Sequence, residues 1–314
     1  MSRTMSINGT AVKPGQNTVI SIEVARLPSH TMIDLPVYVY RSQEDGPVLL
    51  LTAGLHGDEI NGIETIRRIT TDKSVIPQKG TVIAIPVVNI YGFIHMARKF
   101  MDGKDLNRSF PGSKSGSLAS LLAYILTKDI VPVIDVGIDF HTGGASKINY
   151  PHIRCNFDFP EAYKYAGMFA PPFLVNSKAP DNSFRKASAL IHKPVLTFEG
   201  GESLRLHELS IREAIKGIYN LMSALGMKTR NNNTSHTQIL KGSRWHRAGI
   251  SGIFRSAVDI GKKITRGQTL GFITDPFGES EYTVKALNNG YIIGINNLCV
   301  VTKGEALIHI GLPQ

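Results

Sequence analysis

The sequence has few cysteines and no long apolar run, and each shortage excludes a class of protein. Only two cysteines, Cys155 and Cys299, occur in 314 residues. One pair in a chain of this size is no disulfide framework, so we expect reduced thiols. No apolar stretch approaches the ~20 residues of a spanning helix, and Met1 to Gln16 contain no apolar signal-peptide segment. The sequence therefore predicts a cytoplasmic protein without a membrane partner.

Charged residues make up 19% of the chain, as in an ordinary globular protein, but they are unbalanced and give a formal net charge of +10. A positive balance favours anionic partners. The basic residues are scattered and form no Lys and Arg run interleaved with aromatics, so we expect no nucleic-acid partner. A small carboxylated substrate and solubility alone both stay open as explanations of the charge. The sequence also leaves a homo-oligomer open.

Apolar runs and helical patterns alternate along most of the chain. This alternation predicts an α/β domain with a mixed, mostly parallel sheet flanked by helices. The polar segment 89–117 is long for a loop, and loops of this length are usually functional or disordered. The expected strands are 18–25, 36–41, 47–53, 81–88, 133–140 and 194–198, and the expected helices are 59–70, 119–128 and 207–225.

The pattern changes after residue 228. Short Val and Ile runs separated by Gly and Asn follow, and Gly252-Ile-Phe and Gly290-Tyr-Ile open two similar halves. Such a repeat predicts a small pseudo-symmetric β sandwich or barrel. We therefore divide the chain into a catalytic domain at 1–228, a linker at 229–240 and a β-rich domain at 241–314.

Side chains that can bind a metal follow two of the expected strands. His56 and Glu59 lie three residues apart in the turn after strand 47–53, and His141 follows strand 133–140. The carboxyl ends of parallel strands meet at one edge of a sheet, where sites of α/β proteins form. Two imidazoles and one carboxylate with an open fourth position describe a catalytic zinc site.

Two further acids belong to the same edge. Glu199 follows strand 194–198, and a carboxylate near a metal-activated water can act as general base and then as general acid. Asp139 lies two residues before His141, on the same face of the strand. It can orient the imidazole, or it can form a purely structural hydrogen bond.

Each of these residues also has a structural explanation. A lone histidine at a strand end is more often solvated or structural than a ligand, and Glu59 is a favourable acid for the first turn of a helix. Arg98 and Arg108 suit a substrate carboxylate or an oxyanion, or they belong to a solvated basic loop. The convergence of histidines and acids at three strand ends favours the site.

Four motifs together resemble the succinylglutamate desuccinylase/aspartoacylase family, whose catalytic domain is similar to the zinc carboxypeptidases. The resemblance covers nearly the whole chain. The motifs are Gly54-Leu-His56-Gly-Asp-Glu59, Asp105-Leu-Asn107-Arg108-Ser-Phe-Pro-Gly112, Asp139-Phe-His141-Thr-Gly-Gly144 and Phe198-Glu199-Gly200.

The resemblance implies a role for each matching residue and one Zn²⁺ per chain. Glu199 is the implied acid/base and Arg98 the implied group that polarises the scissile carbonyl. The implied zinc ligands are His56, Glu59 and His141, and the implied contacts to an anionic substrate are Asn107, Arg108 and Arg154.

The last 74 residues, 241–314, are similar to lipoyl and biotinyl carrier domains. Those carriers present a lysine in a tight hairpin between the two halves. The corresponding segment here, Thr274-Asp-Pro-Phe-Gly278, has no lysine, so we expect no covalent cofactor.

The expected function is hydrolysis of the amide bond of a small N-acylated amino acid or related amine. A zinc-bound water attacks the carbonyl, with Glu199 as general base. Three alternatives stay open: a zinc carboxypeptidase, an ester-cleaving deacylase, and a non-catalytic metal-binding scaffold protein. The sequence identifies neither the acyl group nor the amine.

Overall fold

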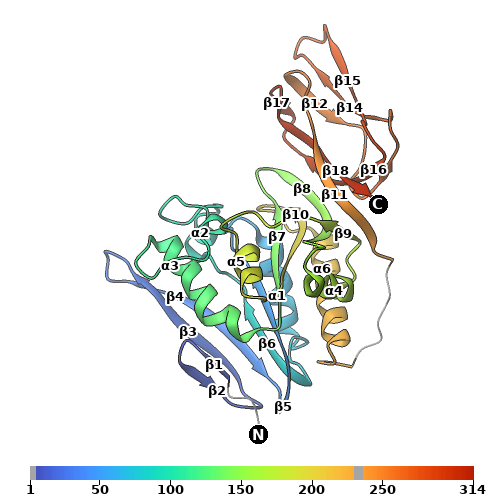
Figure 1. The fold of residues 1–314 in the computed structure, drawn as a ribbon. Coiled ribbons are helices and arrows are strands. Elements are labelled where there is room, and N and C mark those ends of the chain that lie inside the picture. Colours follow the sequence, from blue (N-terminus) through green and yellow to red (C-terminus); the bar gives the residue numbers. More distant parts are fainter. Residues whose placement is uncertain (1–4, 230–235) are drawn as a thin grey trace.

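A computed structural model describes residues 5–229 and 236–314. A 12-stranded sheet runs through the molecule, with helices on both faces of its central part (Figure 1). This arrangement confirms the predicted mixed α/β class. The strand order is β13-β16-β18-β11-β9-β8-β10-β7-β5-β6-β4-β3. The strands that lie before residue 229 are β1 (Met5–Ile7), β2 (Thr10–Val12), β3 (Asn17–Arg26), β4 (Met32–Arg41), β5 (Glu44–Ala53), β6 (Lys79–Ile85), β7 (Val136–Gly143), β8 (Lys147–Cys155), β9 (Phe173–Asn176) and β10 (Val195–Glu202).

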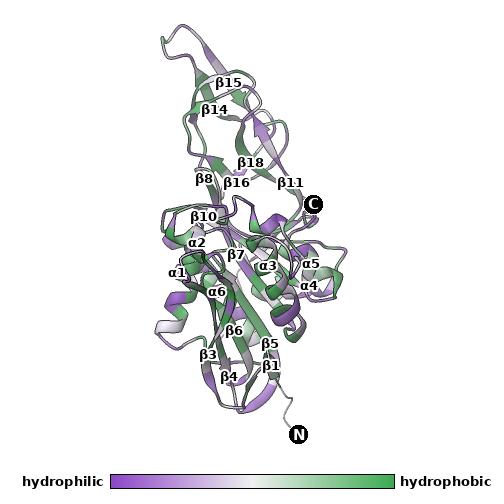
Figure 2. Ribbon diagram, turned by 90° about the vertical axis from the view of Figure 1, so that its left-hand side faces the viewer, coloured by the Kyte–Doolittle hydropathy of each residue, from purple (hydrophilic) through white to green (hydrophobic). Residues whose placement is uncertain are grey.

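Four neighbouring parallel strands, β6, β5, β7 and β10, form the centre of the sheet. Strands β4 and β8 flank them in antiparallel pairing. Strand β5 is buried on both faces: Leu50 packs into one apolar cluster, and Leu49 and Leu51 pack into another. This alternation follows from the period of two along a strand. Much of the central strands is green in Figure 2, as expected for strands that contribute apolar side chains to both clusters.

The helices divide between these two layers. Helices α1, α4 and α6 bury their apolar faces in the cluster that contains Leu49, and α3 and α5 pack in the cluster that contains Leu50. None of the helices described is long and apolar enough to span a membrane. The helices are α1 (Ile60–Thr71), α2 (Ile90–Ile94), η1 (Leu106–Arg108), α3 (Leu118–Ile125), η2 (Leu126–Ile130), η3 (Val131–Val133), α4 (Pro160–Phe169), α5 (Phe184–Leu190) and α6 (Glu208–Ala224).

The segment between residues 147 and 190 contains four elements that the sequence pattern did not predict: β8, α4, β9 and α5. Strand β8 contains Asn149, Pro151 and Arg154, which break the apolar pattern of a buried strand. A second difference concerns the predicted strand ends. His141 and Glu199 lie inside β7 and β10, which continue to residues 143 and 202.

In residues 236–314, every regular element is a strand. Two sheets enclose a third apolar cluster, which includes Phe254, Leu270 and Leu307. The predicted linker 229–240 lies partly outside the described residues, and its last three residues belong to β11. The strands are β11 (Gln238–Arg247), β12 (Gly252–Ser256), β13 (Lys263–Ile264), β14 (Thr269–Thr274), β15 (Glu281–Lys285), β16 (Gly290–Asn296), β17 (Val300–Val301) and β18 (Ala306–Pro313).

The C-terminal strands continue the central sheet directly. Strand β11 pairs in parallel with β9 through Gln238 to Leu240, and β16 pairs with the first residues of β8 through Gly294 to Asn296. Figure 1 shows these strands extending from the β9 end of the sheet, away from the N-terminus. The last part of the chain is thus attached next to the strand that carries Asn149 and Arg154.

Candidate metal centre and active-site cavity

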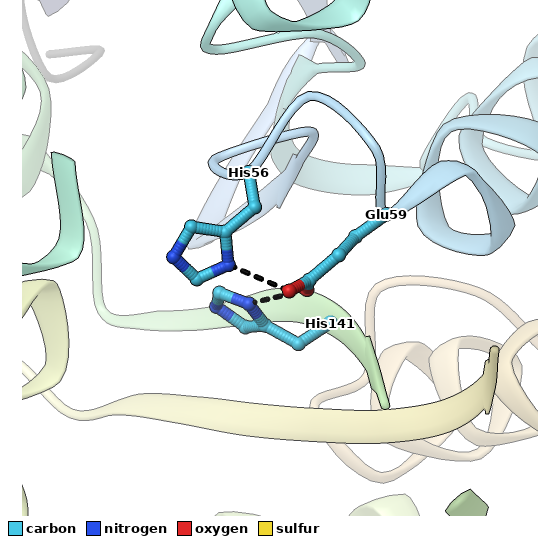
Figure 3. Close-up of side chains that lie close together, drawn as sticks. All are labelled: His56, Glu59 and His141. Carbon is cyan, nitrogen blue, oxygen red and sulfur yellow. Dashed lines mark hydrogen bonds and ion pairs between the residues drawn. The ribbon is translucent and has the colours of Figure 1, made fainter. Parts of the chain in front are cut away.

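Three buried side chains from two segments meet beyond the central strands (Figure 3). His56 and Glu59 lie in the loop between β5 and α1, and His141 lies on β7. The amide N–H of Glu59 donates to the carbonyl of His56 at 3.1 Å, which keeps the loop tight. Glu59 is the N-cap residue of α1, but its carboxylate makes no capping hydrogen bond. It is directed instead toward the two imidazoles.

The loop is tight because glycine permits a close backbone contact. A Cβ atom at position 57 would lie 1.9 Å from the carbonyl carbon of Gly92. Any larger residue at Gly57 would push the loop away from α2. The contact therefore fixes His56 relative to the segment that follows α2, which carries Arg98 and Asp105.

The three side chains share one centre. His56 Nδ1 lies 2.7 Å from Glu59 Oε1, and His141 Nδ1 lies 2.8 Å from Glu59 Oε2. The three ligand atoms, one from each residue, lie within 4.8 Å of one another. Two imidazole nitrogens and a carboxylate that converge in this way are a donor set that zinc accepts. The residues predicted as metal ligands are therefore brought together.

Each imidazole turns its outer nitrogen toward a second carboxylate. His56 Nε2 lies 3.1 Å from Asp105 Oδ1, and His141 Nε2 lies 2.7 Å from Asp139 Oδ2. Such a partner keeps the proton on Nε2 and leaves the lone pair of Nδ1 for a metal. The arrangement of outer carboxylates thus fits a metal at the inner nitrogens.

The charges of the centre stabilise one another. Burial raises the pKa of Glu59, but the positive charges of His56 and His141 outweigh burial and hold that pKa well below its usual value. Burial lowers the pKa of His141, but the charges of Asp139 and Glu59 raise it well above its usual value. The buried carboxylates therefore favour positive charge at the two imidazoles.

The centre lies in a cavity of about 230 Å³ that also contains Glu199. In the sheet, Glu199 is the direct neighbour of His141 on the adjoining parallel strand. Its Oε2 accepts a hydrogen bond from Asn149 Nδ2 at 2.9 Å, and its Oε1 lies 3.5 Å from Arg154 Nη1. The carboxylate is thus held in place on the cavity wall beside the metal centre.

The predicted arginines and Asn107 also line this cavity. Arg98 donates to Glu59 Oε1 at 3.0 Å and to Asp105 Oδ2 at 3.0 Å, with 41% of its side chain exposed. Asn107 Oδ1 accepts from the amide of Phe184 at 2.9 Å, and Arg108 is exposed. All five residues predicted for catalysis and substrate binding therefore surround one cavity.

Arg185 on α5 also lines the cavity, and the sequence analysis missed it. Its Nη2 donates to the carbonyl of Lys178 at 3.0 Å, and within residues 5–229 and 236–314 its buried Nη1 has no hydrogen-bond partner. Burial and then the charge of Arg154 lower the pKa of Arg185 to about 10. Arg185 as a whole is half-buried, and a guanidinium with a buried, unpartnered nitrogen can bind an anion from outside the chain.

Comparison with known proteins points to one family. The family defined as the succinylglutamate desuccinylase/aspartoacylase catalytic domain matches residues 45–225, more than half of the chain. N-alpha-acetyl-L-2,4-diaminobutyric acid deacetylase of Halomonas elongata is 40% identical over 111 residues. That match spans 35% of this chain and about a third, 32%, of the relative's length.

Solved structures share the whole fold. A succinylglutamate desuccinylase/aspartoacylase from Rhodobacter sphaeroides has a TM-score of 0.82 at 23% identity, covering 95% of both chains. The product-bound ectoine utilization protein EutE (DoeB) from Ruegeria pomeroyi has a TM-score of 0.84 at 21% identity, covering 99% of both chains. At these identities, the likeness establishes the fold of the chain, its C-terminal strands included.

Proposed function

This chain belongs to the succinylglutamate desuccinylase/aspartoacylase family, and from that premise we propose that it is a zinc-dependent deacylase. The proposed reaction is hydrolysis of the amide bond of a small N-acylated amino acid or related amine. One observation supports it above all. A buried centre of His56, Glu59 and His141 shares its cavity with Glu199 and with two arginines, Arg108 and Arg185, that form no ion pair within the described residues.

The proposed metal ligands are the inner nitrogens of His56 and His141 and the carboxylate of Glu59. Asp105 and Asp139 would hold the two rings by their outer nitrogens. Zinc, when bound, supplies Lewis acidity that polarises a carbonyl and makes a water molecule more acidic. Two imidazoles and one carboxylate leave a position for such a water, whereas structural zinc sites are usually closed by four protein ligands.

Glu199 is the proposed acid and base. Its carboxylate would take a proton from the attacking water and give a proton to the nitrogen of the leaving amine. Asn149 and Arg154 contact its two oxygens, so these contacts orient the carboxylate and leave it little freedom to turn away. A fixed base costs no reorganisation when the proton moves.

Arg98 is the proposed partner of the scissile carbonyl oxygen. Its guanidinium lies at the metal centre through its contacts with Glu59 and Asp105, and its exposed part faces the cavity that the substrate would enter. A positioned cation stabilises the negative charge that develops on that oxygen. Arg98 thus combines a structural and a proposed electrostatic role.

The remaining cations of the cavity are the proposed anion site. Arg108, Lys147 and Arg185 line the cavity and form no ion pair in the part of the chain that the structure describes. Arg154 forms only a long ion pair, in which its Nη1 lies 3.5 Å from Glu199 Oε1. We propose that Arg108, with Asn107, Arg154 and Arg185, binds the carboxylates of an anionic N-acyl substrate, since a guanidinium pairs with a carboxylate in a fork.

The test is a substrate panel with zinc-loaded protein and a Glu199→Gln variant. The panel contains Nα-acetyl-2,4-diaminobutyrate, N-acetylaspartate, N-succinylglutamate, a short peptide and an ester analogue. We expect amine release from an N-acyl amino acid by the wild type and a loss of at least 10²-fold in the variant. Zinc content, measured by elemental analysis, should be the same in both.

Three outcomes would overturn the proposal or part of it. Turnover of the peptide or the ester alone would assign the chain to carboxypeptidases or esterases with the same base. Equal turnover by Glu199→Gln and wild type would remove Glu199 from the mechanism. Zinc bound without any turnover across the panel would favour the metal-binding scaffold.

A further inference from the structure

One side chain of the cavity comes from the C-terminal strands. The cavity is otherwise lined by residues between 56 and 199, and most of its side chains are charged or polar. Among the described residues that line it, Pro180 and Trp245 are the apolar exceptions. Trp245 lies on β11, which is also the strand that joins the C-terminal part of the chain to β9.

The indole of Trp245 is held by a stacked neighbour. In the pairing of β11 with β18, Trp245 is opposite His309. The two rings are nearly parallel, at 9°, with their centroids 4.5 Å apart. His309 is buried, and its Nε2 is hydrogen-bonded to Ser243 Oγ at 2.9 Å. The indole therefore rests on a fixed ring and cannot easily move out of the cavity wall.

The stacked pair lies near Arg154. Burial, then the charge of Arg154, lowers the pKa of His309 well below its usual value, so the imidazole behind the indole is uncharged. Arg154 in turn has its Nε 3.4 Å from Nε2 of the buried His152. An apolar ring and a guanidinium thus bound the same part of the cavity.

We propose that Trp245 is a specificity-determining residue, whose indole contacts the aliphatic part of the substrate and limits its length. This inference rests on the proposed deacylase function. Charged groups of the cavity can fix the carboxylates of a substrate, but they offer nothing to its methylene groups. A pocket that binds such a molecule needs an apolar wall beside its few polar anchors, and a rigid aromatic ring supplies one at low entropic cost.

The first test measures kcat/KM for two series of substrates, one with acyl chains of increasing length and one with amino-acid side chains of increasing length. Trp245→Ala should lower kcat/KM for the best wild-type substrate at least tenfold. It should also raise the ratio of long to short substrates at least tenfold in one series, because a methylene group in a pocket is worth roughly 10- to 200-fold. For Trp245→Phe, both kcat/KM and this ratio should lie between the values of the wild type and of Trp245→Ala.

A matched control comes from the same strands. Tyr282 on β15 is 43% exposed and lies outside the catalytic cavity, so Tyr282→Ala should leave both ratios unchanged. If Trp245→Ala folds, as judged by circular dichroism, and leaves the ratios in both series unchanged, the inference is wrong.

The second test does not depend on turnover. Trp245 is the single tryptophan of the chain, so intrinsic emission excited at the indole reports on this position alone. In the Glu199→Gln variant, titration with an N-acyl amino acid should change the emission in a saturable way. Titration of the Glu199→Gln, Trp245→Phe double variant should give no indole signal.

The outcomes separate this inference from the function on which it rests. A saturable change of emission without turnover by the wild type would keep Trp245 in the ligand site and reject the hydrolase. Turnover by the wild type with no change of emission up to saturating substrate would keep the hydrolase and reject the role of Trp245.

Discussion

Glu59 is the residue on which most contacts of the candidate metal centre converge. Its two oxygens lie within 3.0 Å of nitrogens from His56, His141, Arg98 and the backbone of Thr142. A single carboxylate thus joins the loop after β5, strand β7 and the segment that follows α2. The same residue that would bind the metal therefore also holds these three segments at fixed distances from one another.

Arg185 offers a test of the anion site at the scale of one residue. We expect Arg185→Gln to raise KM for the N-acyl substrate at least tenfold, about 1.4 kcal/mol of binding free energy, with a smaller effect on kcat. The thermal midpoint should not fall, because removal of an unpaired buried charge relieves a desolvation cost. Steady-state kinetics and thermal unfolding measure the two effects.

Lys186→Gln, one position along α5 and exposed, is the control. Lys186→Gln should change neither KM nor the thermal midpoint. An unchanged KM in Arg185→Gln, or a large loss of stability without a change of KM, would make Arg185 a structural residue.

The residues of the centre could be predicted because they lie in short motifs next to recognisable apolar strands. His56, Glu59 and His141 needed no knowledge of the tertiary fold beyond the shared edge of a parallel sheet. Arg185 could not be found in this way. It lies in the first turn of α5, a short helix that the sequence pattern did not predict. That its Nη1 has no hydrogen-bond partner among the described residues is visible only once the chain is folded.

At the scale of elements, the contact between α4 and α6 depends on one glycine. A Cβ atom at Gly217 would lie 2.0 Å from the ring of Phe169, which is buried at the end of α4. We expect Gly217→Ala to lower the free energy of unfolding by about 1–3 kcal/mol, because overpacking outweighs the better helix propensity of alanine. Urea unfolding measures the difference.

Gly167 is the matched control on α4, since a Cβ atom there meets no atom within 4 Å. Gly167→Ala should raise the free energy of unfolding by up to about 1 kcal/mol. A destabilised Gly167→Ala, or a neutral Gly217→Ala, would contradict this account of the packing.

Apolar runs predicted the central strands and the long helices because burial on both faces leaves a clear pattern. Strand β8 was not predicted, because it lacks this apolar pattern. It contributes Asn149 and Arg154 to the cavity wall, and His152 is buried beside Arg154. A strand that forms the wall of a polar site loses the alternation by which strands are recognised.

For the whole molecule, the continuous sheet gives an expectation about cooperativity. We proposed a division into residues 1–228 and 241–314, but β11 and β16 are hydrogen-bonded to β9 and β8. We therefore expect calorimetry to show one unfolding transition. Zinc should raise the midpoint by mass action, because free zinc at 100 times the dissociation constant adds about 2.7 kcal/mol to the free energy of unfolding.

The zinc effect should be absent in His56→Ala, which serves as the control for non-specific binding. Two resolved transitions, of which only one responds to zinc, would show that the C-terminal strands unfold on their own. The repeat in the sequence predicted the strand-rich character of this region. It could not predict the junction, because hydrogen bonds between strand edges leave no side-chain pattern.

The pairing of β9 with β11 also matters while the chain is being made. A ribosome that has released the first 229 residues has released the elements of the catalytic sheet, but the edge of β9 has no neighbour until β11 emerges. Exposed strand edges pair readily with other chains. The nascent protein therefore keeps this edge of β9 open until β11 has emerged, and a chaperone that shields β9 in that interval would limit aggregation.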